Sequence, residues 1–250
     1  MSGRAGTGTA VGLDGTRDGW IAVVLRDDRV AAVTVVPDLA TAVDRFGDVP
    51  TAVDIPIGLV DEPRRAADVA ARTQLSHTAS SVFPAPARSV VDAFRAGSVA
   101  DHAAANALSR RVAGAGLSRQ TWAIVPKIAE TDALIERGVE LHEVHPELSF
   151  HLLAGRPLAG KRTWNGVMAR LALLRSVGVE LPAAIDGGHR AAPDDIFDAA
   201  VAAWTAAGLH HPAGLRSHPP RPQQHDRGRP IAIWTRPGGG PWSHRATRGD

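Results

Sequence analysis

The sequence predicts an α/β protein with a mixed five-stranded sheet flanked by helices. Short β-rich runs separated by turn residues dominate the first 55 positions, and apolar residues at helical spacing dominate most of positions 63–137 and 147–207. The chain has 250 residues, which is enough to bury a core without disulfides, as one large domain or two small ones.

Each expected strand is bounded by turn residues or by proline. The segment Gly15-Thr16-Arg17-Asp18-Gly19 separates the first two runs and is typical of a hairpin, and Asp27-Asp28-Arg29 separates the second run from the third. Pro56 stops the fourth run, because proline cannot donate to a sheet ladder. The strands are expected at residues 10–14, 20–25, 31–36, 51–55 and 139–144.

Helices are expected between and after these strands. Pro37-Asp38 opens one that runs to about Phe46, and Pro63 suits the first position of another. Ser118 is a typical N-cap, and Pro126 is expected to start or kink a further helix. Together these patterns predict a helical insertion at about 63–137, after the fourth strand. Later helices are expected at roughly 147–154, 163–177 and 194–207.

The domain prediction divides the chain near residue 208. Residues 1–208 carry 21 basic and 24 acidic side chains, whereas residues 209–250 carry 7 arginines and 2 aspartates. In that tail 13 of 42 residues are proline or glycine. We therefore expect one domain at 1–208 and a basic, poorly ordered tail at 209–250, except for one late strand at Arg229–Thr235.

Composition excludes several classes of protein. The chain has no cysteine, which excludes a disulfide framework, a thiolate zinc site and a cysteine nucleophile, and fits a cytoplasmic location. No stretch reaches 18 apolar residues, so no membrane association is expected. Because 26 of the 28 basic residues are arginine, the high isoelectric point alone does not indicate nucleic-acid binding. The sequence leaves the oligomeric state open.

Acidic residues at strand ends are the strongest candidates for chemistry. Asp14 ends the first strand and Asp54 nearly ends the fourth, and the two-residue period of a strand places each on the face of a small neighbour, Gly12 or Ala52. If these strands are neighbours, the two carboxylates converge, with room left by the small residues for an ion. Alternatively, each aspartate only begins a turn.

A third acidic group opens the last helix. Asp194 and Asp195 lie in its first turn, where a cap or the helix dipole favours anions. Asp198 lies one turn deeper in an apolar helix, where a carboxylate is costly unless a cation or a donor neutralises it. Such oxygen ligands select Mg²⁺ or Mn²⁺, and two such ions can promote cleavage of a phosphodiester.

Six ordered segments then carry a family resemblance: Val11-Gly12-Leu13-Asp14-Gly15 with Gly19-Trp20, Asp54-Ile55-Pro56-Ile57-Gly58, Ser80-Ser81-Val82-Phe83-Pro84, Pro126-Lys127-Ile128-Ala129-Glu130, Glu143-Val144-His145-Pro146-Glu147 and Asp195–Ala199. From about residue 10 to 207 they resemble the family called domain of unknown function 429, described as predicted nucleases with an RNase H-like fold. The resemblance implies that fold for this chain.

A more distant resemblance concerns the metal ligands. Asp14, Asp54 and the Asp195/Asp198 pair resemble the ligands of Holliday-junction resolvases, although Asp54 stands where that group commonly has glutamate. The tail departs from the family pattern, in which the last helix continues and a short strand follows. Its histidines and prolines indicate a linker or a frame-shifted segment.

Weaker candidates surround these acids. His145 is a candidate general base or substrate contact and Glu147 a candidate further ligand, although Glu147 is also a typical helix-capping residue. Lys127 is a candidate phosphate contact, but an ion pair with Glu130 or Asp132 explains it equally. The remaining candidate anion-binding residues are Arg64, Arg72 and Arg88.

The sequence therefore predicts a Mg²⁺- or Mn²⁺-dependent nuclease or phosphodiesterase, with nucleic acid as the candidate partner. One alternative is an actin-like phosphotransferase for a small molecule, because Asp14-Gly15-Thr16 resembles the first phosphate loop of those enzymes. A second alternative is a binding module whose site has lost its activity.

Overall fold

The computed structural model describes residues 8–185 and 191–238. The chain forms two compact units, described in turn. The first unit contains the described residues of Met1–Asp54, Glu140–Arg216 and Trp234–Asp250, and the second contains Ile55–Val139 and Ser217–Ile233. Within the described residues, no helix combines the length and the apolar character needed to cross a membrane.

A mixed five-stranded sheet forms the centre of the first unit, as the sequence predicts. Its strand order is β3-β2-β1-β4-β5. Pairs β1–β2 and β2–β3 are antiparallel, whereas β4 is parallel to both β1 and β5. This is the expected RNase H-like arrangement. The strands are β1 (Thr9–Thr16), β2 (Gly19–Arg26), β3 (Arg29–Val36), β4 (Thr51–Val53) and β5 (His142–Glu143).

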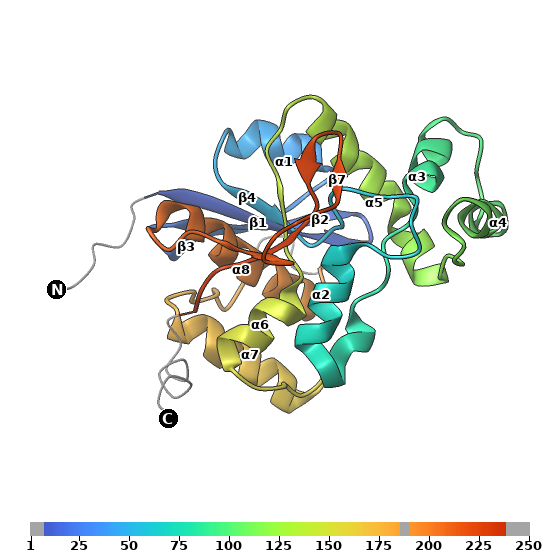
Figure 1. The fold of residues 1–250 in the computed structure, drawn as a ribbon. Coiled ribbons are helices and arrows are strands. Elements are labelled where there is room, and N and C mark those ends of the chain that lie inside the picture. The colour runs from blue at the N-terminus through green and yellow to red at the C-terminus, as the bar shows by residue number, and fades with distance from the viewer. Residues whose placement is uncertain (1–7, 186–190, 239–250) are drawn as a thin grey trace. The chain divides into compact units, whose positions relative to one another are not determined.

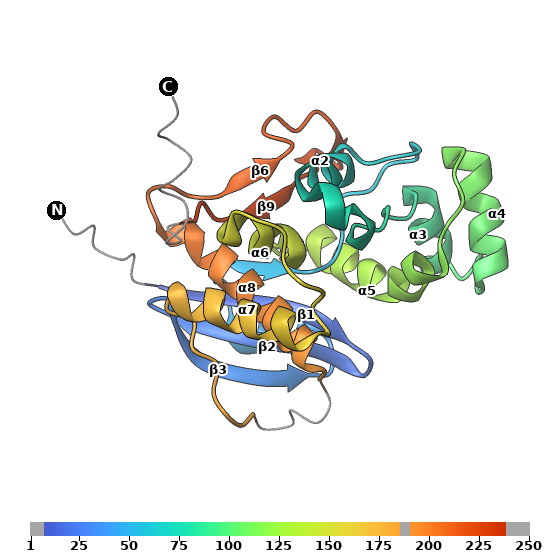
Figure 2. The ribbon, with the colours of Figure 1, turned by 90° about the horizontal axis from the view of Figure 1, so that it is seen from below.

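Helices cover both faces of this sheet. Helix α8 packs on β1, β2 and β4, with α7 beside it on the same face (Figure 2). Helix α1 contacts β2 and β3 and lies on the other face (Figure 1). The helices of this unit are α1 (Leu39–Phe46), α6 (Pro146–Ala154), α7 (Trp164–Ser176) and α8 (Pro193–Ala207).

The main core lies between the sheet and α8. Alternate residues of β2, Ile21, Val23 and Leu25, face the helix and are fully buried. Positions 199–207 of α8 are buried almost all round, since neighbouring α6 and α7 cover what the sheet leaves open. An alanine-rich helix of this kind can approach a sheet closely, which decides where its aspartates lie.

The second unit is the predicted helical insertion together with a later segment. Its α-helices are α2 (Ala66–Leu75), α3 (Arg88–Arg95), α4 (His102–Ala113) and α5 (Arg119–Glu136), with a 3₁₀ segment at Ser76–Ser81. Ser118 caps α5, as predicted, by accepting a hydrogen bond from Thr121 N at 2.9 Å. Pro126 does not start a helix, because α5 runs through that proline.

Part of the predicted tail belongs to the folded structure, which corrects the expectation of poor order for residues 209–238. The described tail contains a 3₁₀ turn and the short strands β6 (Arg216–His218), β7 (His225–Asp226), β8 (Arg229–Pro230) and β9 (Ile233–Thr235). The late strand expected at 229–235 is thus split in two. The other tail residues, 239–250, lie outside the described residues.

Polar anchors and buried apolar residues explain this order. The side chain of Gln224 accepts a hydrogen bond from Ala66 N at 2.6 Å, and that of Asp226 accepts one from Leu59 N at 2.9 Å. Arg227 pairs with Asp132 at 3.1 Å. Residues 231–233 are buried. The segment 217–233 therefore packs onto the insertion, which average composition cannot reveal.

Candidate metal centre

The register between β1 and β4 brings the first two predicted acids together. Leu13 lies opposite Val53 in this parallel pair, and Asp54 N donates a hydrogen bond to Leu13 O at 3.0 Å. Asp14 and Asp54 are therefore neighbours, one position further along each strand and on the same face of the sheet. The strand-period argument from the sequence is confirmed for both residues.

Gly12 lets helix α8 lie directly on this face. A Cβ atom at Gly12 would be 2.0 Å from Ala203 N and 2.1 Å from Ala199 O, both backbone atoms of α8. The expectation that Gly12 leaves room for an ion is therefore wrong, since the helix backbone fills that space. The close approach instead brings Asp198, which directly precedes Ala199 in α8, to the ends of β1 and β4.

Three carboxylates meet at this point: Asp14, Asp54 and Asp198. One ligand oxygen from each lies within 4.8 Å of the other two. Asp14 is 8% exposed and Asp198 is 2% exposed, whereas Asp54 is partly exposed. Asp14 Oδ1 accepts a hydrogen bond from Gly15 N at 2.7 Å. Among the described residues, Asp198 Oδ1 has no hydrogen-bond partner although it is buried.

Burial and repulsion by neighbouring carboxylates destabilise the ionised form of all three acids. Burial raises the pKa of Asp14 well above its usual value, and the neighbouring charges of Asp54 and Asp198 raise it further. Burial, followed by the charge of Asp198, likewise raises the pKa of Asp54. Burial also raises the pKa of Asp198 to about 6, even though Lys161 opposes this shift. A divalent cation would relieve this excess negative charge.

Replacing Asp14 by asparagine is expected to stabilise the metal-free protein at pH 8. The raised pKa means that the folded state holds the proton more tightly than the unfolded state, so the contribution of Asp14 to stability is lost as the pH rises through that pKa. Removing the charge should increase the free energy of unfolding by about 1 kcal/mol and the Tm by about 2–4 °C.

Thermal unfolding in a chelator at pH 8 and pH 5 measures this effect. The advantage of Asp14→Asn should shrink at pH 5, where the wild-type carboxyl is closer to its protonated form. Saturating Mg²⁺ at pH 8 should reverse the order, because only the wild type gains from binding. A variant that is less stable than wild type at pH 8 in chelator would contradict the electrostatic account.

Lys161 is the part of the site that the sequence argument missed. Its Nζ donates a hydrogen bond to Asp198 Oδ2 at 2.6 Å and lies 3.5 Å from Asp194 Oδ2. Burial alone would lower the pKa of Lys161, but Asp198 raises it above its usual value, so the side chain stays charged. The sequence offered one signal for Lys161, the rarity of lysine, since Lys161 and Lys127 are the only lysines beside 26 arginines.

The other acids at the start of α8 have separate partners. Asp195 Oδ2 accepts a hydrogen bond from Ala192 N at 3.2 Å, and so caps the helix. Its charge contributes to the raised pKa of Asp14, after burial, Asp54 and Asp198. Asp194 lies 3.8 Å from Arg162 Nε as well as near Lys161. Asp195 is outside the group of three acids, and its role as a ligand stays a prediction.

The structure gives His145 and Glu147 local roles at the start of α6. His145 is the N-cap, and its Nδ1 accepts a hydrogen bond from Leu148 N at 3.3 Å. Both oxygens of Glu147 accept from Arg170 Nη2, at 2.5 and 2.7 Å. Glu147 is therefore the partner of a buried arginine in this structure, and is not one of the three grouped acids. Sequence patterns gave no signal for Arg170, which is 1% exposed.

The predicted basic candidates all lie in the second unit. Arg88 pairs with Asp132 at 2.7 Å and also with Asp226, so an anion would have to compete with these carboxylates. Arg72 Nη1 donates a hydrogen bond to Val82 O at 2.8 Å. Arg64 is exposed and Lys127 is partly exposed. Asp132, considered above as a partner for Lys127, binds Arg88, Arg95 and Arg227.

The three acids fit a divalent metal ion. Carboxylate oxygens are the ligands that Mg²⁺ and Mn²⁺ prefer. On one octahedral Mg²⁺ ion, with metal–oxygen distances of about 2.1 Å, adjacent oxygens lie about 3.0 Å apart and opposite oxygens about 4.2 Å apart. Side-chain rotations would bring carboxylates that lie within 4.8 Å of one another to these distances. The partnerless Oδ1 of Asp198 provides an acceptor that nothing else in the described residues uses.

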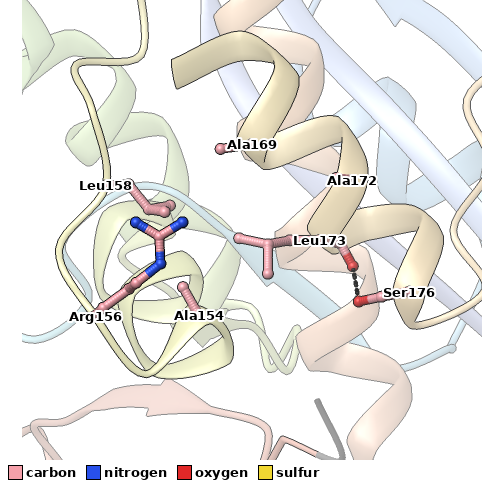
Figure 3. Close-up of a pocket in the computed structure, with 7 residues that line it drawn as sticks. All are labelled: Ala154, Arg156, Leu158, Ala169, Ala172, Leu173 and Ser176. Carbon is pink, nitrogen blue, oxygen red and sulfur yellow. Dashed lines mark hydrogen bonds between the residues drawn. The ribbon is translucent and has the colours of Figure 1, made fainter. Parts of the chain in front are cut away.

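An apolar pocket elsewhere in the first unit is separate from this centre. It lies between the end of α6 and α7 and encloses about 260 Å³. Figure 3 shows Arg156 beside Leu158 and Leu173 at this pocket. Its lining contains none of the candidate acids. The pocket therefore does not extend the acidic centre.

Comparison with known proteins places the chain in a family. No curated protein and no solved structure matches it. The family model described as "Protein of unknown function (DUF429)" matches residues 12–224. This range contains the three grouped acids and extends beyond α8 into the segment that packs on the insertion. The chain belongs to the DUF429 family.

Proposed function

We propose that this protein is a Mg²⁺- or Mn²⁺-dependent nuclease or phosphodiesterase. The observation that carries the proposal is the grouping of Asp14, Asp54 and Asp198 within 4.8 Å, with the buried Oδ1 of Asp198 free to bind a cation. Asp195 is proposed as an additional ligand, because it starts the same helix and contributes to the raised pKa of Asp14.

The chemistry of the centre favours phosphodiester hydrolysis. A bound divalent ion would activate a water molecule and stabilise the leaving oxygen. The protein's own acids would hold that ion at the ends of β1 and β4, and Lys161 would balance part of their charge. The RNase H-like strand order supports nucleic acid as the substrate. A cytoplasmic location stays a prediction from composition.

Metal removal tests the proposal. Purified protein should cleave at least one of single- or double-stranded DNA and RNA, or bis(p-nitrophenyl) phosphate, in millimolar Mg²⁺ or Mn²⁺. Cleavage should fall to background in EDTA, because the acids alone cannot stabilise the leaving oxygen. Restoring the metal after EDTA should restore the rate, which separates metal dependence from irreversible unfolding.

The same material distinguishes the alternatives. Calorimetric binding of ATP without nuclease activity would favour the small-molecule phosphotransferase. A binding module that has lost its activity would bind nucleic acid without cleaving it, and would bind no Mg²⁺ or Mn²⁺ at millimolar concentrations of these ions. Either result would contradict the proposed function.

A further inference from the structure

Lys161 lies at one end of the three-acid centre. Its Nζ is 2.6 Å from Asp198 Oδ2, and the Asp198 side chain is 3% exposed. The lysine side chain is 34% exposed, so its charged end reaches inward from the protein surface. The ion pair is therefore partly shielded from water. Opposite charges in such a place attract each other more strongly than at an open surface.

The fold supports this position of Lys161. Arg170, on α7, donates a hydrogen bond from Nη1 to Ala159 O at 3.0 Å, while Glu147 binds its Nη2. A Cβ at Gly166 would be 2.0 Å from Gly160 O, so the loop between α6 and α7 packs directly against the start of α7. Two contacts therefore fix the backbone just before Lys161, and they position the lysine for its ion pair with Asp198.

This contact limits how Asp198 can bind metal. In the bidentate bridging mode, a carboxylate between two ions, which lie about 3.5–4 Å apart in two-metal sites, binds one ion through each oxygen. Lys161 already binds Oδ2 of Asp198, and only Oδ1 is without a partner among the described residues. Asp198 can therefore bind one ion through Oδ1 but cannot bridge a pair in this mode unless Lys161 leaves.

Charge balance leads to the same result. Ionised Asp14, Asp54 and Asp198 carry three negative charges, and Lys161 carries one positive charge. One divalent ion brings this set to neutrality, whereas a second would leave uncompensated positive charge in a largely buried centre. Nearby Asp194 already pairs with Lys161 and Arg162. Asp195, proposed above as an additional ligand, would add one further negative charge, which is still fewer than the two positive charges that a second divalent ion brings.

We propose that the centre holds a single divalent ion and that the ammonium group of Lys161 takes the place of a second. The inference rests on the metal site of the proposed function and goes beyond it, since it assigns the number of ions and a role to Lys161. Lys161 would supply, from the chain itself, the positive charge that a two-metal centre takes from solution.

Binding of Mn²⁺ alone tests this inference without any assay of activity. Metal-free protein is titrated with MnCl₂, and bound Mn²⁺ is counted and examined by electron paramagnetic resonance. Wild type should bind one ion per chain at the centre, with the spectrum of an isolated ion. Lys161→Met should bind two ions with a spin-coupled spectrum. Lys161→Gln should behave in the same way, because it removes the charge and a neutral amide yields Oδ2 of Asp198 to a metal ion more readily than an ammonium group does.

Two controls separate charge from structure. Lys161→Arg keeps the charge and should retain one ion. Arg162→Met removes the same charge from the neighbouring residue, whose side chain is 89% exposed, and should also retain one ion. Circular dichroism verifies that each variant is folded.

Every other result overturns the inference. Two coupled ions in wild type would overturn it and leave the proposed function intact. A single ion in both Lys161→Met and Lys161→Gln would also overturn it alone. Wild type that binds no Mn²⁺ would overturn both the inference and the metal site on which the proposed function depends.

Discussion

Replacing Asp54 by asparagine is expected to lower metal-dependent cleavage by about a thousandfold or more, since loss of residues that only orient ligands already costs about 10–100-fold. Asp54 follows β4, beside the end of β1 that carries Asp14, and is one of the three members of the acidic group. Asparagine has almost the same shape but carries no negative charge and binds Mg²⁺ more weakly. Because Asp54 is partly exposed, the substitution should leave the fold intact.

Steady-state cleavage and Mn²⁺ binding measure the effect of Asp54→Asn. Asp18→Asn is the matched control, because Asp18 is an exposed aspartate in the turn between β1 and β2 of the same unit. The control should retain the wild-type rate and affinity. An Asp54→Asn variant that cleaves as fast as wild type would show that the three acids are not the site of the reaction.

Replacing Gly12 by alanine is expected to lower the free energy of unfolding by about 3 kcal/mol or more, at the upper end of what overpacking a core costs. The added methyl group would have to occupy space held by backbone atoms of α8, at 2.0 and 2.1 Å. A backbone cannot rotate aside as a side chain can, so the helix must move away from β1. That movement would carry Asp198 away from Asp14 and weaken Mn²⁺ binding as well.

Urea unfolding measures the effect of Gly12→Ala, with Gly160→Ala as the control. Within 4 Å, a Cβ at Gly160 would meet only Thr163 Cγ2 among the residues that the structure describes, at 3.9 Å, which is an ordinary contact. Gly160→Ala should therefore change the free energy of unfolding by less than about 0.5 kcal/mol. Equal stability of the two variants would contradict the direct packing of α8 on the sheet.

Strand periodicity allowed the sequence to predict much of the fold and part of the centre. The two-residue alternation placed Asp14 and Asp54 on one face before their strands were known to pair, and the observed register confirms it. Asp198 was also predicted from its depth in an apolar helix, where an unpaired carboxylate is costly. In these cases, the information is local to a few residues of one element.

Contacts between distant segments could not be predicted in this way. Lys161 lies in a loop between two helices, and only the packing of α7 and α8 brings it to Asp198. Nothing near Gly12 in the sequence shows that a helix backbone, and not an ion, fills its space. The tail segment 217–233 was misjudged because a few anchors, such as Gln224 and Asp226, outweigh its proline and glycine content.

A crystal structure of the protein with Mn²⁺ tests the central claim most directly. Anomalous scattering should reveal an ion bound by oxygens of Asp14, Asp54 and Asp198. The distances from the metal to the carboxylate oxygens should be about 2.1–2.2 Å, as is typical of such ions. Crystals that contain ordered Mn²⁺ at other carboxylates but none between these three, at saturating metal and pH 8, would contradict the account.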